Sequence, residues 1–439
     1  MPLAGTRVHL DRALERLQPL SSKFHAASAK TAHARGAACG KLRASARRIV
    51  RRFSVYLLRL VLKNSLRHKL RTTLTVVGIV VAITAFGLLR TIVDAWYAGA
   101  NASSSARLVT RNSISLAFGL PLNYAQRIRQ VDGVTGVSWA NWFGGVYITE
   151  RNFFPQFAID AATYLDAYPE FILAPDEKKA FLVDRQGAIV GRKLANQYGW
   201  KVGDQIPLRG TIFSGTWTFN LRGIYDGADK GTDQSTMFFH WALLNETIKK
   251  RFPRRGDQAG VFIVKLKDPG QAAPVSADID AVFKNSLAET LTETEKAFQL
   301  GFVAMTEAIL LAIQAVSFVV IIIIMAVMAN TMAMTARERG SEYATMKALG
   351  FGGGYVALLI LGESLVIALT GGAIGVALTF PLAHAFADAM GSLFPIFLIS
   401  DETLAMQAGA ALVVGLVAAA LPAWRAANIR IVDGLRAVG

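Results

Sequence analysis

Cysteine is nearly absent from this sequence: the only one among its 439 residues is Cys39. A chain with one cysteine closes no internal disulfide and offers no paired-cysteine site for zinc. Each folded segment must therefore be held together by packing, hydrogen bonds and charge pairs.

Several motifs that carry chemistry are missing too. The sequence contains no GxxxxGK[ST] phosphate loop, no HExxH and no GxSxG, the motifs that mark nucleotide binding, zinc peptidases and serine hydrolases. We therefore predict a chain that is not an enzyme, with no catalytic residue, no bound metal and no cofactor of its own.

What the sequence has in excess is uncharged apolar sequence, with 53% hydrophobic residues. Crossing a bilayer takes about 20 consecutive apolar residues in a helix. Four stretches qualify, at 72–96, 304–334, 353–387 and 403–424. The fold class predicted from them is a membrane protein: a four-helix transmembrane bundle with a large mixed α/β extracytoplasmic domain inserted between spans 1 and 2.

Charge predicts how the four spans are oriented. Residues 1–73 hold 17 lysines and arginines against two acids, whereas the turn 388–402 holds no lysine or arginine. Positive residues close to span ends stay in the cytoplasm. Both termini and the turn 335–352 are therefore predicted to be cytoplasmic, and 388–402 is predicted to be a short outer loop. Because the basic excess lies in an arm and not in a folded domain, we expect no nucleic-acid partner.

The N-terminal region divides into two parts. Residues 1–52 are rich in Ala, Arg and Ser and are predicted to be a disordered basic arm. A membrane-surface anchor, an import signal and upstream sequence from a misplaced start codon are open alternatives. Residues 53–71 place apolar side chains at helical spacing and predict an amphipathic helix in the membrane interface.

The loop 97–303 has ordinary soluble composition, with 23 basic and 20 acidic residues. A helical pattern at 123–131 precedes a strand-like run towards 142–148, and the alternating strand pattern 260–267 precedes a helix at 275–287. These two ends predict matching strand–helix–strand halves. The middle, about 150–255, is predicted to be an inserted lobe, and the tail 425–439 returns to the cytoplasm.

Span 3 contains the candidate helix-packing residues. A carboxylate inside a span is costly and is a functional candidate by default, so Glu363 has two interpretations, a hydrogen bond to a neighbouring helix or proton coupling. We favour the structural one. Gly371, Gly372 and Gly375 follow it, and small residues let helix backbones approach closely in lipid.

The turn between spans 2 and 3 is longer than a simple connection requires. Residues 335–352 read TARERGSEYATMKALGFG and predict a short charged amphipathic helix on the cytoplasmic surface. A helix of this kind is suited to docking a cytosolic partner. The candidate partner contacts are Arg337, Glu338, Arg339, Glu342, Tyr343 and Lys347.

At these residues the sequence resembles the MacB/FtsX family of ABC transporter permeases, in which a charged RExG-like helix precedes a KALG-type end. Four further segments resemble the family in the same order along the chain: LRHKLRTTLTVVGIVVAI, LPLNYAQRIRQVDGVTGVSWANWFGGVY, AIVGRKLANQYGWKVGDQIPL and LPAWRAANIRIVDGLRA. The resemblance covers nearly everything after residue 52.

The resemblance implies a function that composition cannot give. It implies a LolC/LolE-like permease without a fused ATPase domain, in the bacterial inner membrane. Its implied partners are a cytosolic ABC ATPase dimer that carries ATP and Mg²⁺, a second permease copy or homologue, and a periplasmic adaptor. ATP-driven motion would pass through the helices to the outer domain, to export or extract an amphiphilic substrate.

Two other functions stay open at this point. One is an FtsX-like regulator that activates periplasmic enzymes without moving a substrate, and the other is a receptor-like sensor without an ATPase. Fold alone does not separate them.

Overall fold

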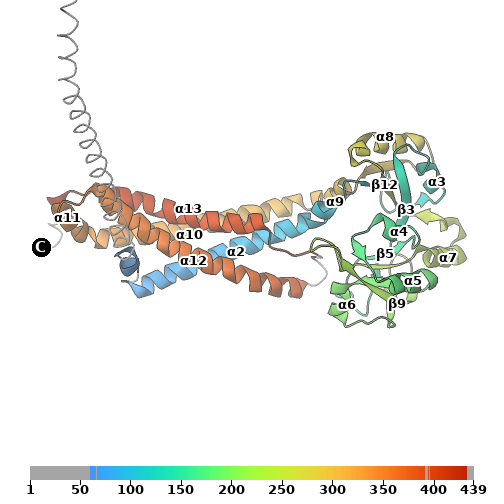
Figure 1. Ribbon diagram of the computed structural model, residues 1–439, viewed down its shortest axis with the longest axis horizontal. Helices are drawn as coiled ribbons and strands as arrows, with labels where there is room; N and C mark the ends of the chain where they lie inside the picture. Colours follow the sequence, from blue (N-terminus) through green and yellow to red (C-terminus); the bar gives the residue numbers. More distant parts are fainter. Residues whose placement is uncertain (1–59, 66, 391–393, 395, 433–439) are drawn as a thin grey trace, which may run out of the picture. The chain divides into compact units, whose positions relative to one another are not determined.

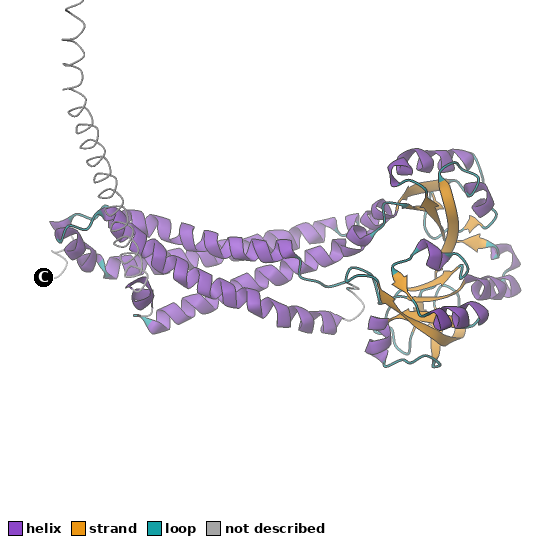
Figure 2. Cartoon of the chain, in the orientation of Figure 1, coloured by secondary structure: helices purple, strands orange, loops and turns teal. Residues whose placement is uncertain are grey.

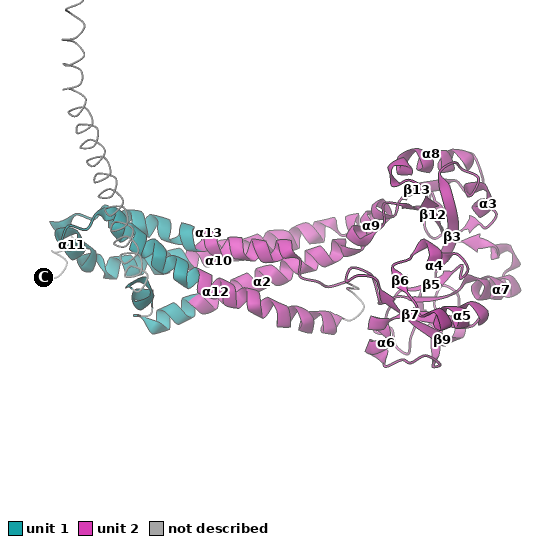
Figure 3. Cartoon of the chain, in the orientation of Figure 1, with its two compact units in different colours: residues 1–75, 328–368, 415–439 teal, residues 76–327, 369–414 magenta. Residues whose placement is uncertain are grey.

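The computed structural model of the chain describes residues 60–432 except 66, 391–393 and 395. The predicted arm 1–52 lies outside the described residues, as do parts of the segments 53–71, 388–402 and 425–439. The described chain forms two compact units (Figure 3). Unit 1 consists of the described residues up to 75, residues 328–368 and the described residues from 415 on. Unit 2 consists of residues 76–327 and the described residues of 369–414.

Among the described residues, four helices are long and apolar enough to cross a membrane. They are α2 (Lys69–Ala102), α10 (Glu307–Glu338), α12 (Gly353–Met390) and α13 (Asp401–Ala427). Each contributes residues to both units. The number of spans and the position of the large domain between the first two are therefore as the sequence predicts, and each helix runs beyond its apolar core at one or both ends.

The cytoplasmic-turn prediction needs a correction in its geometry. The predicted single helix 335–352 is not one element, because α10 continues to Glu338 and a separate short helix, α11 (Gly340–Ala348), follows. Similarly, the described part of the predicted helix 53–71 is broken: residues 60–65 are helical, and a turn at 67–68 precedes α2.

The inserted domain contains thirteen strands and seven α-helices among its described residues (Figure 2). The strands are β1 (Arg107–Asn112), β2 (Leu120–Pro121), β3 (Val134–Trp142), β4 (Gly145–Val146), β5 (Gln156–Ile159), β6 (Phe171–Ile172), β7 (Gly187–Gly191), β8 (Gln205–Gly210), β9 (Gly215–Gly227), β10 (Met237–His240), β11 (Gln258–Ala259), β12 (Val261–Leu266) and β13 (Thr290–Thr294). The helices are α3 (Tyr124–Ile128), α4 (Tyr164–Ala167), α5 (Pro175–Val183), α6 (Arg192–Tyr198), α7 (Trp241–Arg251), α8 (Ala272–Val282) and α9 (Glu295–Ala304).

One mixed sheet organises this domain, in the order β13-β1-β12-β3-β5-β10-β7-β9-β8-β4, with β6 paired to β9. Figure 1 labels β12, β3, β5 and β9 of this sheet. The strand–helix–strand segments predicted at the two ends are confirmed as β1–α3–β3 and β12–α8–β13. Their four strands are neighbours, because β12 pairs antiparallel with both β1 and β3. The ends of the loop therefore build one half of the sheet, and its middle builds the other half.

Burial follows the strand patterns. In β8 the residues alternate between exposed and buried, as in a sheet with one face in water, whereas all five residues of β7 are buried. One core packs α3 and α8 on the first half of the sheet, and a second packs α6 and α7 around Phe143, Phe219 and Phe239. The domain thus builds its own hydrophobic core without a disulfide.

Candidate functional site

The candidate coupling helix α11 has defined ends. Arg339 leaves helical geometry at φ −100° and ψ 13°, which separates α11 from α10. At the other end Gly350 has a φ of +96°. Its N–H bonds to the Lys347 carbonyl and the Phe351 N–H bonds to the Met346 carbonyl, each at 3.0 Å. This is a Schellman motif, in which glycine supplies the left-handed residue, so the KALGF sequence fixes where α11 stops.

Arg339 lies buried at the start of α11, between two carboxylates. Its Nη1 donates to Glu363 of α12 at 3.0 Å, and its Nε donates to Glu342 one turn further along α11, also at 3.0 Å. Burial opposes the charge, but the Tyr343 ring and the two carboxylates outweigh it and raise the pKa of Arg339. Arg339 therefore stays charged and ties α11 to α12.

Two more exposed charge pairs connect the same region to the N-terminal side of the chain. Arg67, in the turn before α2, donates to Glu342 at 2.5 Å. Arg71, in the first turn of α2, binds both oxygens of Glu338 at 2.8 Å. Glu342 thus receives hydrogen bonds from both Arg67 and Arg339, which outweigh its partial burial and lower its pKa.

The remaining predicted contacts on α11 point into unit 1. Tyr343 is only 2% exposed and packs in a cluster with Val356 and Ile360 of α12 and Ala419 and Ala423 of α13. Burial raises the pKa of Tyr343 to about 12, so its hydroxyl stays neutral.

Lys347 completes the attachment of α11. Its ammonium donates to the carbonyls of Ala427 and Ile429, at 2.7 and 2.8 Å. Ala427 is the last residue of α13. A lysine at a helix C-terminus satisfies free carbonyls and complements the helix dipole, so Lys347 fixes α11 to the end of α13.

Two of the six candidate partner contacts, Arg337 and Glu338, are exposed. Glu338 forms the ion pair with Arg71 given above. Two large apolar residues outside the six candidates are also exposed in this region. They are Leu349 at the end of α11, 74% exposed, and Phe351 in the turn that follows it, 37% exposed. The signal available in the sequence was the position of these two apolar residues on either side of Gly350, which ends the helix.

The three candidate packing glycines lie in unit 2, at helix contacts. A Cβ at Gly371 would come within 2.9 Å of Ile79, and one at Gly375 within 2.9 Å of Ile83, both on α2. A Cβ at Gly372 would come within 2.5 Å of Ala411 on α13. The glycines therefore allow α12 to approach two neighbouring helices closely.

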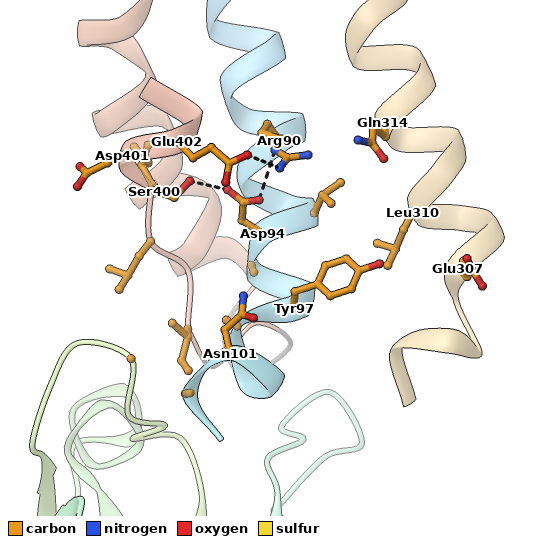
Figure 4. A pocket seen from close by; sticks show the side chains of 18 of the residues that line it. Arg90, Asp94, Tyr97, Asn101, Glu307, Leu310, Gln314, Ser400, Asp401 and Glu402 are labelled. Carbon is orange, nitrogen blue, oxygen red and sulfur yellow. Dashed lines mark hydrogen bonds and ion pairs between the residues drawn. The ribbon is translucent and has the colours of Figure 1, made fainter. Parts of the chain in front are cut away.

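A cavity of 790 Å³ in unit 2 is lined by the last turns of α2, the first turns of α10 and the segment that leads into α13. Figure 4 shows Arg90 of α2 beside Asp94 and Glu402, to each of which it pairs at 3.4 Å. Asp94 also accepts hydrogen bonds from Ser400 at 2.7 Å and Thr403 at 2.8 Å.

The cavity combines these charges with apolar lining from Leu310, Leu311 and Leu398. The lining of the cavity therefore includes both charged and apolar side chains.

A second buried arginine organises the sheet domain. Arg107, the first residue of β1, binds Glu170 through two nitrogens at 2.6 and 3.1 Å and Glu295 of α9 at 2.8 Å. It also lies 4.2 Å from the centre of the Tyr168 ring. Because β1 follows α2 and α9 precedes α10, this network joins the two places where the domain connects to the membrane helices.

Comparison with known families matches most of the chain. Residues 72–282 match the MacB-like periplasmic core domain, and residues 315–431 match the FtsX-like permease C-terminal domain. The two ranges together cover about three quarters of the sequence. The chain belongs to the MacB/FtsX type of ABC transporter permease.

Individual relatives agree with this assignment. An uncharacterised ABC transporter permease protein of Mycobacterium tuberculosis is 25% identical over 199 residues, which are 45% of this chain and 22% of that protein. This permease thus spans less than a quarter of the length of that curated relative.

Two solved structures of extracytoplasmic domains are similar to part of this chain. The extracellular domain of the noncanonic ABC-type transporter YknZ from Gram-positive bacteria is 13% identical, with a TM-score of 0.31, and the match covers 43% of this chain and 100% of that one. The periplasmic region of MacB from Actinobacillus actinomycetemcomitans is 10% identical, with a TM-score of 0.33, over 46% of this chain and 94% of that one.

Proposed function

We propose that this permease transmits the ATP-driven motion of a separate cytosolic ATPase to its extracytoplasmic domain, and thereby exports or extracts an amphiphilic substrate. The chain itself performs no catalysis in this proposal, and ATP with Mg²⁺ is bound by the ATPase. The observation that carries the proposal is the attachment of α11.

Short as it is, α11 and its flanking residues contact every membrane helix that contributes to unit 1. The contacts are Glu338 to Arg71 of α2, Arg339 to Glu363 of α12, and Lys347 to the end of α13, while α10 leads directly into α11. A force on α11 therefore reaches four helices at once. Because all four also contribute to unit 2, a rigid displacement has a continuous covalent route to the other unit.

The proposed ATPase contact is the exposed tip of α11 around Leu349 and Phe351. A large apolar side chain that is 74% exposed at the end of a charged helix is suited to a pocket on a partner protein. The buried Arg339 and Tyr343 and the capping Lys347 would then hold the contact in place and not form it.

The orientation proposed is the one that charge favours, with α11 and both termini on the cytoplasmic side of the bacterial inner membrane. A second permease completes the complex. Helix α10 is the best candidate for that contact. In its most apolar stretch 17% of the residues are buried within the chain, compared with 44% in the corresponding stretch of α2. A periplasmic adaptor is a further proposed partner.

The mixed cavity beside Arg90 supports an amphiphile as the substrate. It offers charged side chains from α2 and the start of α13, while α10 contributes the apolar Leu310 and Leu311 beside Glu307 and Gln314. Its 790 Å³ is within the range of about 300–1,000 Å³ that is usual for ligand sites.

The test is co-purification of the tagged chain from its native membrane in mild detergent, with mass spectrometry and an ATPase assay. We expect an ATP-binding subunit with ATPase activity to be recovered. Leu349→Glu should abolish its recovery, because a charge would enter the apolar contact. Val432→Glu alters another exposed apolar residue of unit 1 (65% exposed) and should leave the recovery unchanged.

Recovery of the chain without any nucleotide-binding subunit would overturn the proposal. Recovery of the ATPase together with a periplasmic hydrolase, and no substrate movement in reconstituted vesicles, would replace transport by the FtsX-like regulatory function.

A further inference from the structure

A second cavity, of 530 Å³, lies in unit 1 between α10 and α13, and we call it the inner groove. From α10 it is lined by Ala329, Ala333 and Ala336, and from α13 by Val417, Ala418 and Leu421. The three alanines recur at spacings of four and three residues, so they share one helix face. Because they carry only a methyl group, the groove between the two helices is left unfilled.

The rim of the inner groove is basic. Arg337 is in the last turn of α10 and Arg425 is in the last turn of α13, and both are exposed and line the groove. Glu338 lines it too, but both of its oxygens are bound by Arg71 at 2.8 Å. The acid at the rim is thus neutralised by a third arginine, and the two arginines keep their positive field.

We propose that the inner groove binds one anionic phospholipid of the surrounding bilayer, with its phosphate between Arg337 and Arg425 and an acyl chain along the alanine face. A basic site between membrane helices, at the level where their apolar part ends, matches the chemistry of anionic lipid head groups. The hydroxyl of Ser341, which also lines the groove, adds a hydrogen-bond donor.

Charge favours a lipid over a second copy of this chain in the same groove. Two copies related by a two-fold axis would bring their grooves face to face, which would place four arginines together. Trp424, 64% exposed beside Arg425, is the type of residue that anchors helices at the level of lipid head groups. The proposal does not depend on the ATPase coupling.

The test uses the full chain in a neutral detergent, titrated with phosphatidylglycerol or phosphatidylcholine, with the bound lipid counted by native mass spectrometry. Each arginine near a head group contributes about a fivefold gain in affinity for an anionic lipid, so Arg337→Gln with Arg425→Gln should weaken phosphatidylglycerol binding about twenty-fivefold. Phosphatidylcholine binding should change little.

Arg430→Gln is the matched control. It removes one exposed positive charge from the same end of the chain, outside the groove lining, and should leave binding unchanged. Replacing both groove arginines by lysine should restore most of the affinity, and Ala333→Leu should weaken binding of both lipids by filling the groove. Thermal unfolding of each variant verifies that it is folded.

Three results would overturn the proposal. One is equal phosphatidylglycerol affinity in the double glutamine variant and the unmodified chain, and another is an equal loss in Arg430→Gln. The third is a change of oligomeric state in Ala333→Leu with lipid binding intact, which would assign the groove to a second copy of the chain.

Discussion

Each unit contains a buried arginine held by two glutamates, and the two networks differ in what surrounds them. In unit 2, Arg107 joins β1 to Glu170 and Glu295 and is covered by the Tyr168 ring. In unit 1, Arg339 joins Glu363 and Glu342. The side chain of Glu295 is 9% exposed, whereas that of Glu342 is 40% exposed and also binds Arg67.

This difference in exposure affects how easily each arginine can change its partners. Charges that leave water need all their partners, and an unpaired charge in a buried site is costly. The Arg107 network is the more enclosed of the two, because its more exposed carboxylate, Glu170, is 25% exposed, compared with 40% for Glu342. The Arg339 network extends through Glu342 to solvent, where water can replace a partner at little cost. We infer that unit 2 uses its arginine to hold a junction, and unit 1 uses its arginine where partners exchange.

The largest effect should follow from Arg107→Ala. It leaves Glu170 and Glu295 without their shared cation, and breaking a buried pair costs about 3–5 kcal/mol. Thermal unfolding of the full chain, followed by tryptophan fluorescence, measures the loss. Arg111→Ala is the control, because it removes the neighbouring arginine of β1, whose pair with Glu293 is more exposed. Equal losses in both variants would contradict the special position of Arg107.

Glu363→Ala should also destabilise the chain, but less than Arg107→Ala. Arg339 loses its buried partner and keeps Glu342, so the cost should lie at the lower end of about 3–5 kcal/mol. The double variant Arg339→Ala with Glu363→Ala should lose little more than either single variant, because each already breaks the same pair. Additive losses in thermal unfolding would show that the two residues act independently.

The sequence predicts the elements of this permease better than the contacts between them. Apolar runs and strand alternation are local signals, and they predict four spans and the two strand–helix–strand halves. The break at Arg339 was missed, because RERG continues a helical pattern and only tertiary contacts end α10 there. The partner of Glu363 lies 24 residues away and that of Arg107 lies 188 residues away. Nothing in the local pattern specifies such pairs.

The candidate site shows the same division. The charges of 335–352 predicted a surface helix. In the structure Tyr343 packs against α12 and α13, and Lys347 binds carbonyls at the end of α13. The local sequence does not specify these contacts, because they depend on where α12 and α13 pack. The role of the six residues in ATPase coupling stays a prediction.

A smaller effect is expected where unit 2 packs helices without charge. Gly375→Ala places a Cβ 2.9 Å from Ile83, and overpacking costs about 1–3 kcal/mol. Gly409→Ala on α13 is the control, since a Cβ there meets no atom within 4 Å. If both substitutions shift the unfolding temperature equally, close approach at Gly375 is not what holds α12 to α2.

Acid should weaken the sheet domain through His240. Burial lowers the pKa of His240 below its ordinary value of 6.5, and its Nε2 contacts the Phe181 carbonyl at 2.7 Å. The neutral form is favoured in the fold. Its contribution is complete above about pH 6.5 and is lost as the pH falls from there towards the lowered pKa.

Thermal unfolding at pH 7.5 and 5 measures this loss. The loss of stability between pH 7.5 and pH 5 should be smaller in His240→Gln than in the unmodified chain. In His384→Gln, which replaces an exposed histidine, the loss should equal that of the unmodified chain. An equal acid response in all three chains would assign the effect to other groups.

The smallest effect on stability, and the largest on coupling, should come from reversing one exposed charge of unit 1. Glu338→Lys places a cation against Arg71 and leaves Glu342, which also binds the buried Arg339, unchanged. The Arg71–Glu338 pair is exposed, and exposed pairs contribute little to stability, so thermal unfolding should change only slightly. The attachment to α2 through Arg71 should nevertheless be lost, and the stimulation of the ATPase by the permease should fall.

Arg71→Glu in the same chain restores opposite charges and should recover part of the stimulation. Recovery would show that the pair acts as a mechanical link whichever of the two positions carries the negative charge. Undiminished ATPase stimulation in Glu338→Lys would mean that α11 transmits through Arg339, Glu342 and Lys347, and that the link to Arg71 has no part in coupling.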